Sequence, residues 1–436
     1  MSTFRLSRIT SSIVHLACGV WLIACTSSVP EPRPLTLTPS SPVTLTLWHA
    51  YTDTSAALIQ TFINDFQAAY PAISVRVEHK ASAAEILRQG LAAIALNQPP
   101  DVVMAEWRTL AEFARRGALV PLETLMNDPA LGLREDARAD FVAGLLETGR
   151  LPELGQRTFA FPFEQRPIVL YYNVEALQAA KVAAPRTWEQ FSEAARVTTR
   201  GQRYGWVMSP EALIWYAMLF SRGGNVLNAA QTQAQFTDDA GVKSLQLIVA
   251  LTQSGAAHLV AADEQARAEF MQGKATFWLS RTDAVVHLSQ TATSPTFSWG
   301  VTNVPQNDPQ RAVTAYDGIA IGIFQRTDVH TRAAWLLTRW LTAPEQSARW
   351  SRATLSAPAR RSAYALVALD VPPTLVIWRE SDATLPALRA APTVKDAAQI
   401  DATITTLWTN VANGADLTIE LKNAAARVNR LLGNVP

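Results

Sequence analysis

Cysteine is nearly absent from this sequence. The 436 residues include only two, Cys18 and Cys25, and both lie close to the first residue. The rest of the chain therefore has no thiol for a disulfide or for thiolate chemistry, even in an oxidising compartment. Charged residues are few, at 17%, and the net charge is +1, so no basic surface indicates nucleic acid as a partner.

The sequence also lacks the short motifs that mark common catalytic sites. It contains no G-x-S-x-G, no G-x-x-x-x-G-K-[ST], no H-E-x-x-H and no G-x-G-x-x-G. Five histidines follow the N-terminal segment, at positions 49, 79, 258, 287 and 330, and their scatter indicates no metal site. We therefore expect no metal, no cofactor and no enzymatic activity. A glycosidase needs only two carboxylates in an aromatic cleft, and it stays open as an alternative.

The N-terminal segment has the layout of a secretory signal peptide. Two arginines precede a mostly apolar run, residues 9–24, which is short for a bilayer-spanning helix and is interrupted by polar residues. The motif LIAC, which ends at Cys25, resembles the lipobox of bacterial lipoproteins. That resemblance implies a signal peptide over residues 1–24 and lipidation of Cys25. A plain signal peptide, or an uncleaved anchor with two incidental cysteines, is the alternative.

Residues 26–42 are rich in proline, serine and threonine and poor in bulky apolar side chains. Such a segment cannot bury a core, so we expect an extended tether between Cys25 and a folded body. The body begins at about residue 43, is 48% hydrophobic by the composition of the whole chain, and is long enough for two lobes. No second long apolar run occurs in it, so we expect it to be soluble.

Strands and helices alternate at the start of the body. Periodicity predicts strands over 43–49, 72–79 and 101–107, and helices over 53–70 and 83–96, with Asp53 or Thr54 as the first N-cap. Further strands are expected at 158–163 and 167–173, and a capping box at TWEQ opens a helix. A β-α-β-α-β order predicts a parallel sheet, in which ligands lie at the carboxyl ends of the strands.

A resemblance to a known family emerges from several stretches taken in order. They are VTLTLWHAYTD, LIQTFINDFQAAYPAISVRV, PPDVVMAEW, LAEFARRGALVPL, FAFPFEQRPIVLYYN, APRTWEQF, EFMQGKATFW, WGVTNVP and AWLLTRWLTAPEQSARW. Together they resemble the extracellular solute-binding proteins of ABC importers, in the branch of the maltose- and glycerol-3-phosphate-binding proteins. The resemblance implies an α/β fold of two lobes, joined by hinge crossings, with a ligand cleft between them.

The same resemblance implies where the chain crosses between lobes. The crossings are expected near Pro162-Phe163, near Val304-Pro305 and near Thr342-Pro344. The first lobe then comprises residues 43–162 and 305–343, and the second lobe comprises residues 163–304 and 344–436.

Ligand contacts are implied after the first and third strands. His49 and Tyr51 follow one, and Glu106 and Trp107 follow the other, at positions where the family meets its ligand. A carboxylate beside an aromatic ring suits a sugar, because the acid accepts hydrogen bonds from hydroxyls and the ring stacks on C–H faces. The alternatives are that His49 and Tyr51 satisfy backbone groups in their loop, that Glu106 is a surface residue, and that Trp107 belongs to the core.

The stretch FEQRP lies at the expected first crossing and carries Glu164 and Arg166, which are costly to bury unpaired. They either contact the ligand or pair with each other or across the hinge. The glycerol-3-phosphate binders have small hydroxyl residues in this stretch, so the resemblance does not carry that substrate over directly. An arginine there could still clamp a phosphate or a carboxylate.

Five more residues complete the candidate ligand contacts. Trp215 lies in a helical stretch where the family often has a cleft aromatic, although helical spacing also suits the core. Arg281 follows a strand, and Asp317 and Gly318 precede another, where Gly318 resembles a family position at which backbone meets ligand. Arg389, in LPALRAAP, resembles an arginine of the glycerol-3-phosphate binders.

These patterns predict the substrate-binding subunit of an ABC importer. It captures a sugar, an oligosaccharide or a glycerol-3-phosphate-like solute outside the cytoplasm and delivers it to the transmembrane subunits of a permease. We expect a monomer that contacts the membrane only through lipidated Cys25, at the cell surface or in the periplasm, and that binds no nucleic acid. A secreted glycosidase and a surface lipoprotein that binds another protein are the alternatives.

Overall fold

The computed structural model describes residues 42–290, 295–367 and 385–433. The expected signal peptide, Cys25 and nearly all of the tether lie outside the described residues. In the first part of the body the elements are β1 (Val43–His49), α1 (Asp53–Ala69), β2 (Ile73–His79), α2 (Ala83–Ala95), β3 (Val102–Glu106), α3 (Trp107–Arg115), α4 (Glu123–Met126), α5 (Glu135–Ala139), α6 (Leu145–Thr148), β4 (Arg150–Leu151) and β5 (Arg157–Thr158).

The remaining elements begin with a long strand, β6. They are β6 (Phe161–Asn173), α7 (Val174–Ala180), α8 (Trp188–Thr198), β7 (Tyr204–Met208), α9 (Ala212–Phe220), α10 (Asp239–Gln253), β8 (Ala257–Leu259), α11 (Asp263–Met271), β9 (Ala275–Arg281), α12 (Val285–Gln290), β10 (Trp299–Asn303), β11 (Val313–Ile323), α13 (Asp328–Leu341), α14 (Pro344–Thr354), α15 (Arg361–Val367), β12 (Ala387–Ala390), α16 (Ala397–Ala412) and α17 (Leu417–Leu431).

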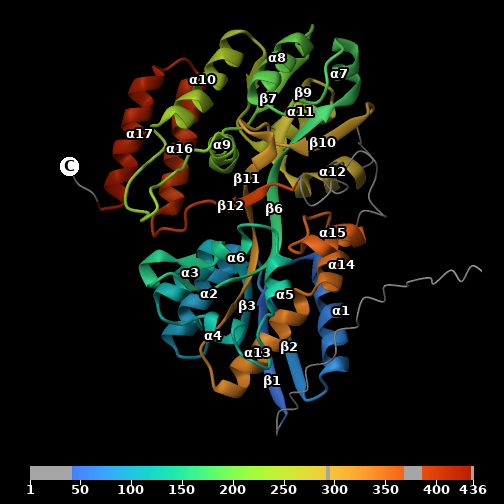
Figure 1. Ribbon diagram of the computed structural model, residues 1–436, viewed down its shortest axis with the longest axis vertical. Helices are drawn as coiled ribbons and strands as arrows, with labels where there is room; N and C mark the ends of the chain where they lie inside the picture. Colours follow the sequence, from blue (N-terminus) through green and yellow to red (C-terminus); the bar gives the residue numbers. More distant parts are fainter. Residues whose placement is uncertain (1–41, 291–294, 368–384, 434–436) are drawn as a thin grey trace, which may run out of the picture. The chain divides into compact units, whose positions relative to one another are not determined.

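Two groups of parallel strands are joined by two long antiparallel strands. The order is β2-β1-β3-β11-β6-β9-β7-β8, with β10 beside β6 and β12 beside β11. β1 is parallel to β2 and β3, and β7 is parallel to β8 and β9, whereas β6 and β11 are antiparallel to each other. We call the part around β1–β3 the first lobe and the part around β7–β9 the second lobe (Figure 1).

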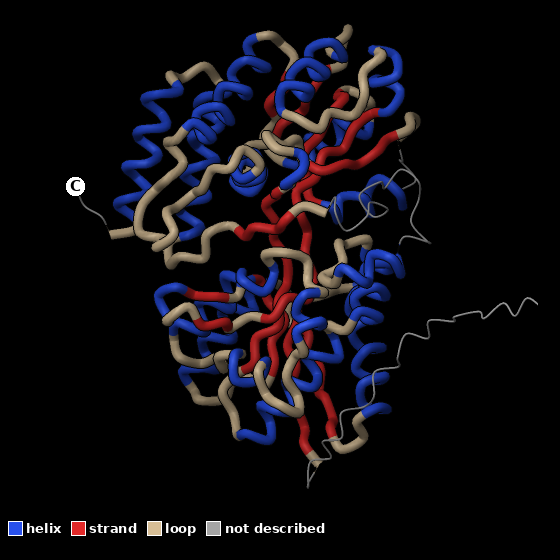
Figure 2. Tube along the Cα trace, viewed as in Figure 1, coloured by secondary structure: helices blue, strands red, loops and turns tan. Residues whose placement is uncertain are grey.

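This arrangement confirms the predicted α/β fold with two lobes. Helices lie around both groups of strands, and β6 and β11 pass from one group to the other (Figure 2). The alternation of the first five elements also agrees with the prediction, because their apolar periodicity is strong and local. One detail differs: α1 begins at Asp53, and Thr52 precedes it as N-cap without a side-chain bond.

The first crossing lies inside a continuous strand. Residues 158–163 and 167–173 were expected to form separate strands, yet β6 runs without a break from Phe161 to Asn173. Its first half pairs with β11 and its second half pairs with β9 and β10. Proline at 167 does not end the strand, because its missing N–H falls where the pairing changes from one partner to another.

The expected boundary near Thr342-Pro344 is wrong. Pro344 does begin a new helix, α14, but α14 packs on α1 of the first lobe rather than joining the second. Trp350 of α14 lies 4.8 Å from Tyr51 between ring centroids, and Arg349 forms an ion pair with Asp65 at 2.8 Å. The buried indole of Trp350 needs an apolar partner, and α1 supplies it through Phe62.

The crossing expected near Val304-Pro305 also lies later in the chain. Gln306 still bonds with the second lobe, where its N–H donates to the carbonyl of Arg186. The passage to the first lobe occurs along β11, whose Val313–Tyr316 part pairs with β12 and whose Ile319–Ile323 part pairs with β3. The first-lobe portion of this stretch therefore begins in the middle of β11.

Helix α9 is apolar on every side. All nine of its residues are buried, and they join a core that includes side chains of α8, α10 and α16. A helix that is hydrophobic all round must lie inside a domain. The core of the second lobe is therefore built around α9, and this decides the position of Trp215.

Candidate ligand-binding site

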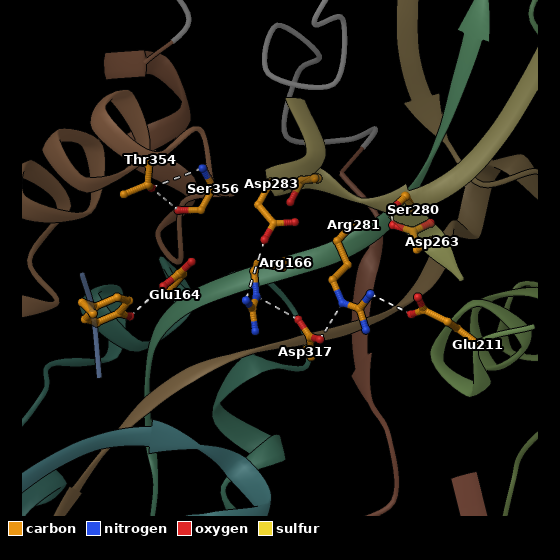
Figure 3. A network of polar contacts seen from close by, with 12 residues as sticks. Glu164, Arg166, Glu211, Asp263, Ser280, Arg281, Asp283, Asp317, Thr354 and Ser356 are labelled. Carbon is orange, nitrogen blue, oxygen red and sulfur yellow. Dashed lines mark hydrogen bonds and ion pairs between the residues drawn. The ribbon is translucent and has the colours of Figure 1, made fainter. Parts of the chain in front are cut away.

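Charged side chains of β6, β9 and β11 meet where the two lobes join (Figure 3). Asp317 of β11 accepts a hydrogen bond from Nε of Arg166 at 3.0 Å through one oxygen. Its other oxygen accepts from Nε of Arg281 at 2.7 Å. Arg281 also donates to Glu211 at 2.8 Å, and Arg166 lies 3.7 Å from Asp283. Three carboxylates therefore compensate the two arginines.

These ion pairs favour the charged forms of their members. Burial lowers the pKa of Arg281, but the carboxylates of Asp317 and Glu211 outweigh it, so the pKa lies above its ordinary value. Arg166 behaves in the same way beside Asp317. Burial raises the pKa of Asp283, and the charge of Arg166 opposes that rise. Both guanidinium groups are thus fixed as cations by their neighbours.

Tyr51 and Glu164 form a second polar contact in the same region. The hydroxyl of Tyr51 donates to Oε2 of Glu164 at 2.6 Å. Burial, and then the charge of Glu164, raise the pKa of Tyr51 well above its ordinary value, so the phenol keeps its proton. Burial also raises the pKa of Glu164. The hydroxyl of Tyr51 is therefore a hydrogen-bond donor to Glu164. This contact differs from the predicted alternative, in which Tyr51 satisfies a backbone group.

Gly318 lies where β11 approaches the backbone of β6 closely. A Cβ at this position would lie 2.0 Å from the carbonyl oxygen of Glu164, so only glycine fits. The neighbouring Asp317 pairs with Arg166 across the two strands. Close strand contact thus explains this glycine without a ligand, although Gly318 also lines a cavity.

Three cavities adjoin along the boundary between the lobes. Cavity A, of about 330 Å³, is lined by residues that include Tyr51, Glu106, Glu164, Arg166 and Asp283. Cavity B, of about 160 Å³, is lined by residues that include Glu106, Trp107, Arg108, Tyr216, Arg281, Tyr316, Asp317, Gly318 and Asp401. Cavity C, of about 610 Å³, is lined by residues that include Glu147, Asn225, Asn228, Gln231, Gln235 and Arg389.

Shared residues connect the three cavities into one cleft. Glu106 lines both A and B, whereas Ala390, Ala391 and Thr393 line both B and C. Glu106 is exposed at the end of β3, and Trp107 begins α3 with its indole packed edge-on against Tyr316 at 6.2 Å. The carboxylate after the third strand therefore reaches the cleft. Trp107 is only 6% exposed, so it borders cavity B from the core, as its alternative predicts.

His49 bonds with a backbone group of its own loop, as the alternative to ligand contact predicts. It is only 2% exposed, and its Nδ1 accepts the backbone N–H of Tyr51 at 3.1 Å. Burial, and then the charge of His79, lower the pKa of His49 to about 4, so the ring is neutral at pH 7. His49 thus orders the loop after β1 and holds Tyr51 beside the cleft.

Trp215 does not line the cleft, and of its two interpretations the structure shows the core. Trp215 is fully buried in α9 and packs edge-on against Phe236 at 5.6 Å. The next residue, Tyr216, lines cavity B instead and donates its hydroxyl to Asp401 at 2.7 Å. A tyrosine within an otherwise apolar helix needs a partner for its hydroxyl, and this was the available indication of its role.

Arg389 differs from the other two arginines because its partners are neutral. It donates to the carbonyl of Gly224 at 3.3 Å and to the side chain of Asn225, and it lies over the ring of Phe220 at 4.2 Å. Among the described residues no carboxylate is within ion-pair distance of Arg389. Burial lowers the pKa of this uncompensated arginine.

Arg108 and Asp401 were not found from the sequence. Arg108 of α3 and Asp401 of α16 both line cavity B and form an ion pair. They are 293 residues apart, and no local pattern indicates a contact over such a separation. Among the described residues, no group of His, Cys, Asp and Glu could hold a metal ion, and no helix is long and apolar enough to cross a membrane.

Comparison with known proteins identifies the family of this chain. Residues 50–348 match the family of bacterial extracellular solute-binding proteins, so the chain belongs to that family. The chain is 22% identical over 339 residues to the sn-glycerol-3-phosphate-binding periplasmic protein UgpB of Yersinia pestis bv. Antiqua, covering 73% of this chain and 74% of the relative.

Solved structures with the same fold come from several bacteria. The cyclic alpha-maltosyl-1,6-maltose binding protein of Arthrobacter globiformis has a TM-score of 0.79 at 19% identity, covering 91% of this chain and all of that one. The sugar-binding protein MalE of Xanthomonas citri has a TM-score of 0.78 at 23% identity, covering 89% and 97%. UgpB of Mycobacterium tuberculosis, in complex with glycerophosphocholine, has a TM-score of 0.71 at 20% identity, covering 90% and 99%. The protein is thus a solute-binding protein, as the sequence predicts.

Proposed function

We propose that this protein captures a carbohydrate without net charge in the cleft between its lobes and delivers it to the permease of an ABC importer. One observation carries the choice of solute. Asp317 accepts hydrogen bonds from both Arg166, which the sequence left open as a clamp for phosphate, and Arg281. A phosphate at these arginines would have to displace a carboxylate that is already in place.

The groups around cavities A and B suit hydroxyls. Glu106 is exposed to the cleft and offers two acceptor oxygens. The rings of Trp107 and Tyr216 border cavity B, but at 6% and 0% exposure they form its wall and offer little surface for stacking. Amide side chains of Gln231 and Gln235 line cavity C, where they can both donate and accept. The continuous cleft favours an oligosaccharide over a single sugar unit.

Arg389 favours a second candidate, a glycerol-phosphate-like solute. Its guanidinium lines cavity C without a carboxylate partner among the described residues. An anionic ligand would supply that missing charge. This candidate predicts that binding weakens strongly at high salt, whereas binding of a neutral sugar does not.

A thermal-shift screen of the purified protein separates the two candidates. The probes are maltose, trehalose, xylose-type oligosaccharides, glycerol 3-phosphate and glycerophosphodiesters. A ligand at 100 times its Kd stabilises the folded state by about 2.7 kcal/mol. A shift with a neutral sugar alone supports the proposal, and a shift with phosphate compounds alone contradicts it and favours the second candidate.

We further propose that the protein is a monomer that returns its solute unchanged and is held at the membrane by lipidated Cys25. The family consists of binding proteins, which supports the absence of catalysis. Chromatography of a bound sugar after incubation tests it, because hydrolysis products would indicate a glycosidase. A relative from Streptomyces antibioticus, 27% identical over 230 residues, is named a lipoprotein, which supports the anchor.

A further inference from the structure

Two charged residues connect the lobes directly, away from the strands that carry the chain across. Arg108 is the second residue of α3, in the first lobe, and Asp401 lies in the first half of α16, in the second lobe. Both terminal nitrogens of Arg108 donate to the carboxylate of Asp401, and the distance from Nη2 to Oδ1 is 3.1 Å. A bidentate ion pair of this kind fixes the orientation of both side chains.

Neighbouring groups hold each partner in place. Tyr216 donates its hydroxyl to Asp401 at 2.7 Å from the buried helix α9. Nε of Arg108 donates to the carbonyl of Pro392 at 3.2 Å, and Arg115, two turns further along α3, donates to the carbonyl of Thr393. Helix α3 therefore contacts the second lobe at three points that do not involve a crossing strand.

The pair also lies on the wall of the solute cleft. Arg108, Asp401 and Tyr216 all line cavity B, next to Glu106 and Trp107. Motion of one lobe away from the other would separate α3 from α16, and the pair would break. Motion that narrows the cleft would keep the pair intact.

We propose that Arg108 and Asp401 form an interlobe clasp that shifts the balance between open and closed cleft toward the closed form before any solute binds. A solute that binds the closed form then gains apparent affinity in proportion to the closed fraction. The clasp thus sets the strength of capture independently of which solute is recognised.

The exposure of the pair bounds its effect. The side chains are 34% and 28% exposed, so water and salt reduce their attraction. We expect the clasp to change the ratio of closed to open protein by about two- to fivefold, within the range of exposed ion pairs. High salt should shift the balance in the same direction as loss of the clasp.

Distance measurement between the lobes tests the clasp without a solute. Ala92 of α2 and Ala426 of α17 are exposed and belong to different lobes. Cysteines at both positions, in the full chain with Cys18 and Cys25 replaced by serine, carry spin labels for pulsed electron paramagnetic resonance. We expect Asp401→Asn to move population from the shorter to the longer distance, because asparagine keeps the size of aspartate and can still accept from Tyr216.

Reversal of the charges distinguishes the clasp from a merely structural contact. Arg108→Asp combined with Asp401→Arg should restore the shorter distance that either single change loses. Asp239→Asn, which breaks an ion pair within α10, serves as the matched control and should leave the distances unchanged. Arg108→Gln provides the same comparison from the first lobe if Asp401→Asn does not fold.

An unchanged distance distribution in folded Asp401→Asn and Arg108→Gln would overturn the proposal. If the Tm of these variants is lower while the distances stay unchanged, the pair has a local structural role. Neither result depends on the sugar, so the carbohydrate proposal stands or fails separately in the ligand screen.

Discussion

Tyr51 donates its hydroxyl hydrogen to Glu164 at 2.6 Å, and this bond joins the loop after β1 to the crossing strand β6. The two residues are 113 positions apart, and Glu164 is only 7% exposed. A carboxylate buried to this degree needs a donor. The bond therefore links the first lobe to the strand that leads into the second.

Replacement of Tyr51 by phenylalanine should lower the free energy of unfolding by about 1–2 kcal/mol, because Glu164 loses a buried donor. Denaturant unfolding measures the change. Tyr204→Phe is the control, because the hydroxyl of Tyr204 makes no hydrogen bond with the described residues, and it should change stability little. Equal stability of wild type and Tyr51→Phe would show that Glu164 finds another donor.

Glu106→Gln tests the proposed acceptor in the cleft. The carboxylate is exposed and lines cavities A and B, so we expect a change in unfolding free energy within about 0.5 kcal/mol. Affinity for the sugar that binds best in the screen should fall about tenfold or more, since hydrogen bonds to a charged group are lost. Calorimetry measures the affinity, with Glu135→Gln on the exposed surface of α5 as control. Unchanged affinity would remove Glu106 from the site.

Gly318→Ala should destabilise the protein by about 2–3 kcal/mol. The added methyl group would lie 2.0 Å from the carbonyl oxygen of Glu164 and 2.9 Å from Cα of Gln165, and neither backbone atom can move without separating β6 from β11. Gly117→Ala, where nothing lies within 4 Å but φ is +69°, should cost about 1 kcal/mol from backbone strain alone. Thermal or denaturant unfolding compares them, and equal losses would contradict the strand-contact explanation.

His49 predicts a loss of stability in mild acid. Its pKa is lowered to about 4 in the folded protein by burial and by His79, so the unfolded chain binds more protons below about pH 6.5. Stability contributed by neutral His49 is present above that pH and is lost as the pH falls toward 4. Between pH 7 and 5 the loss should be about 2 kcal/mol. His49→Gln should remove this part of the pH dependence, and an identical acid profile in the variant would exclude His49 as its source.

Cys25→Ser tests the proposed lipid anchor. Without the thiol no thioether to a lipid can form, so the protein should move from the membrane fraction to the soluble fraction of the host. Cys18→Ser should leave the protein with the membrane, because a cleaved signal peptide takes Cys18 with it. Retention of Cys25→Ser in the membrane fraction would contradict the anchor.

Local signals in the sequence predicted their structures well. Thr187 and Gln190 form the expected capping box at the start of α8, and Pro344 begins α14. Asn413 and Gly414 lie between α16 and α17, where a glycine commonly ends a helix. Each of these features depends on residues within one or two turns, so neighbouring side chains decide them.

Contacts between residues far apart in the chain were harder to predict from the sequence. The sequence pattern and the family resemblance together indicated most of the side chains around the crossing, which include Glu164, Arg166, Arg281 and Asp317. They could not show that Asp317 accepts hydrogen bonds from both arginines. Charge alone predicts that a buried arginine has a partner but not which one. For this reason the sequence left sugar and phosphate solutes as alternatives, and the ion pairs are the observation on which we propose a sugar.

The sequence by itself determined that this chain is a cysteine-poor α/β body of alternating strands and helices, because periodicity and caps act over a few residues. The tertiary structure decided that Trp215 lies in the core and that the hydroxyl of the buried Tyr216 bonds with Asp401 beside cavity B, because α9 is enclosed on every side. It also decided that α14 joins the first lobe and that Arg108 meets Asp401. These outcomes depend on which surfaces the fold brings together across hundreds of residues, and no short pattern in the chain records them.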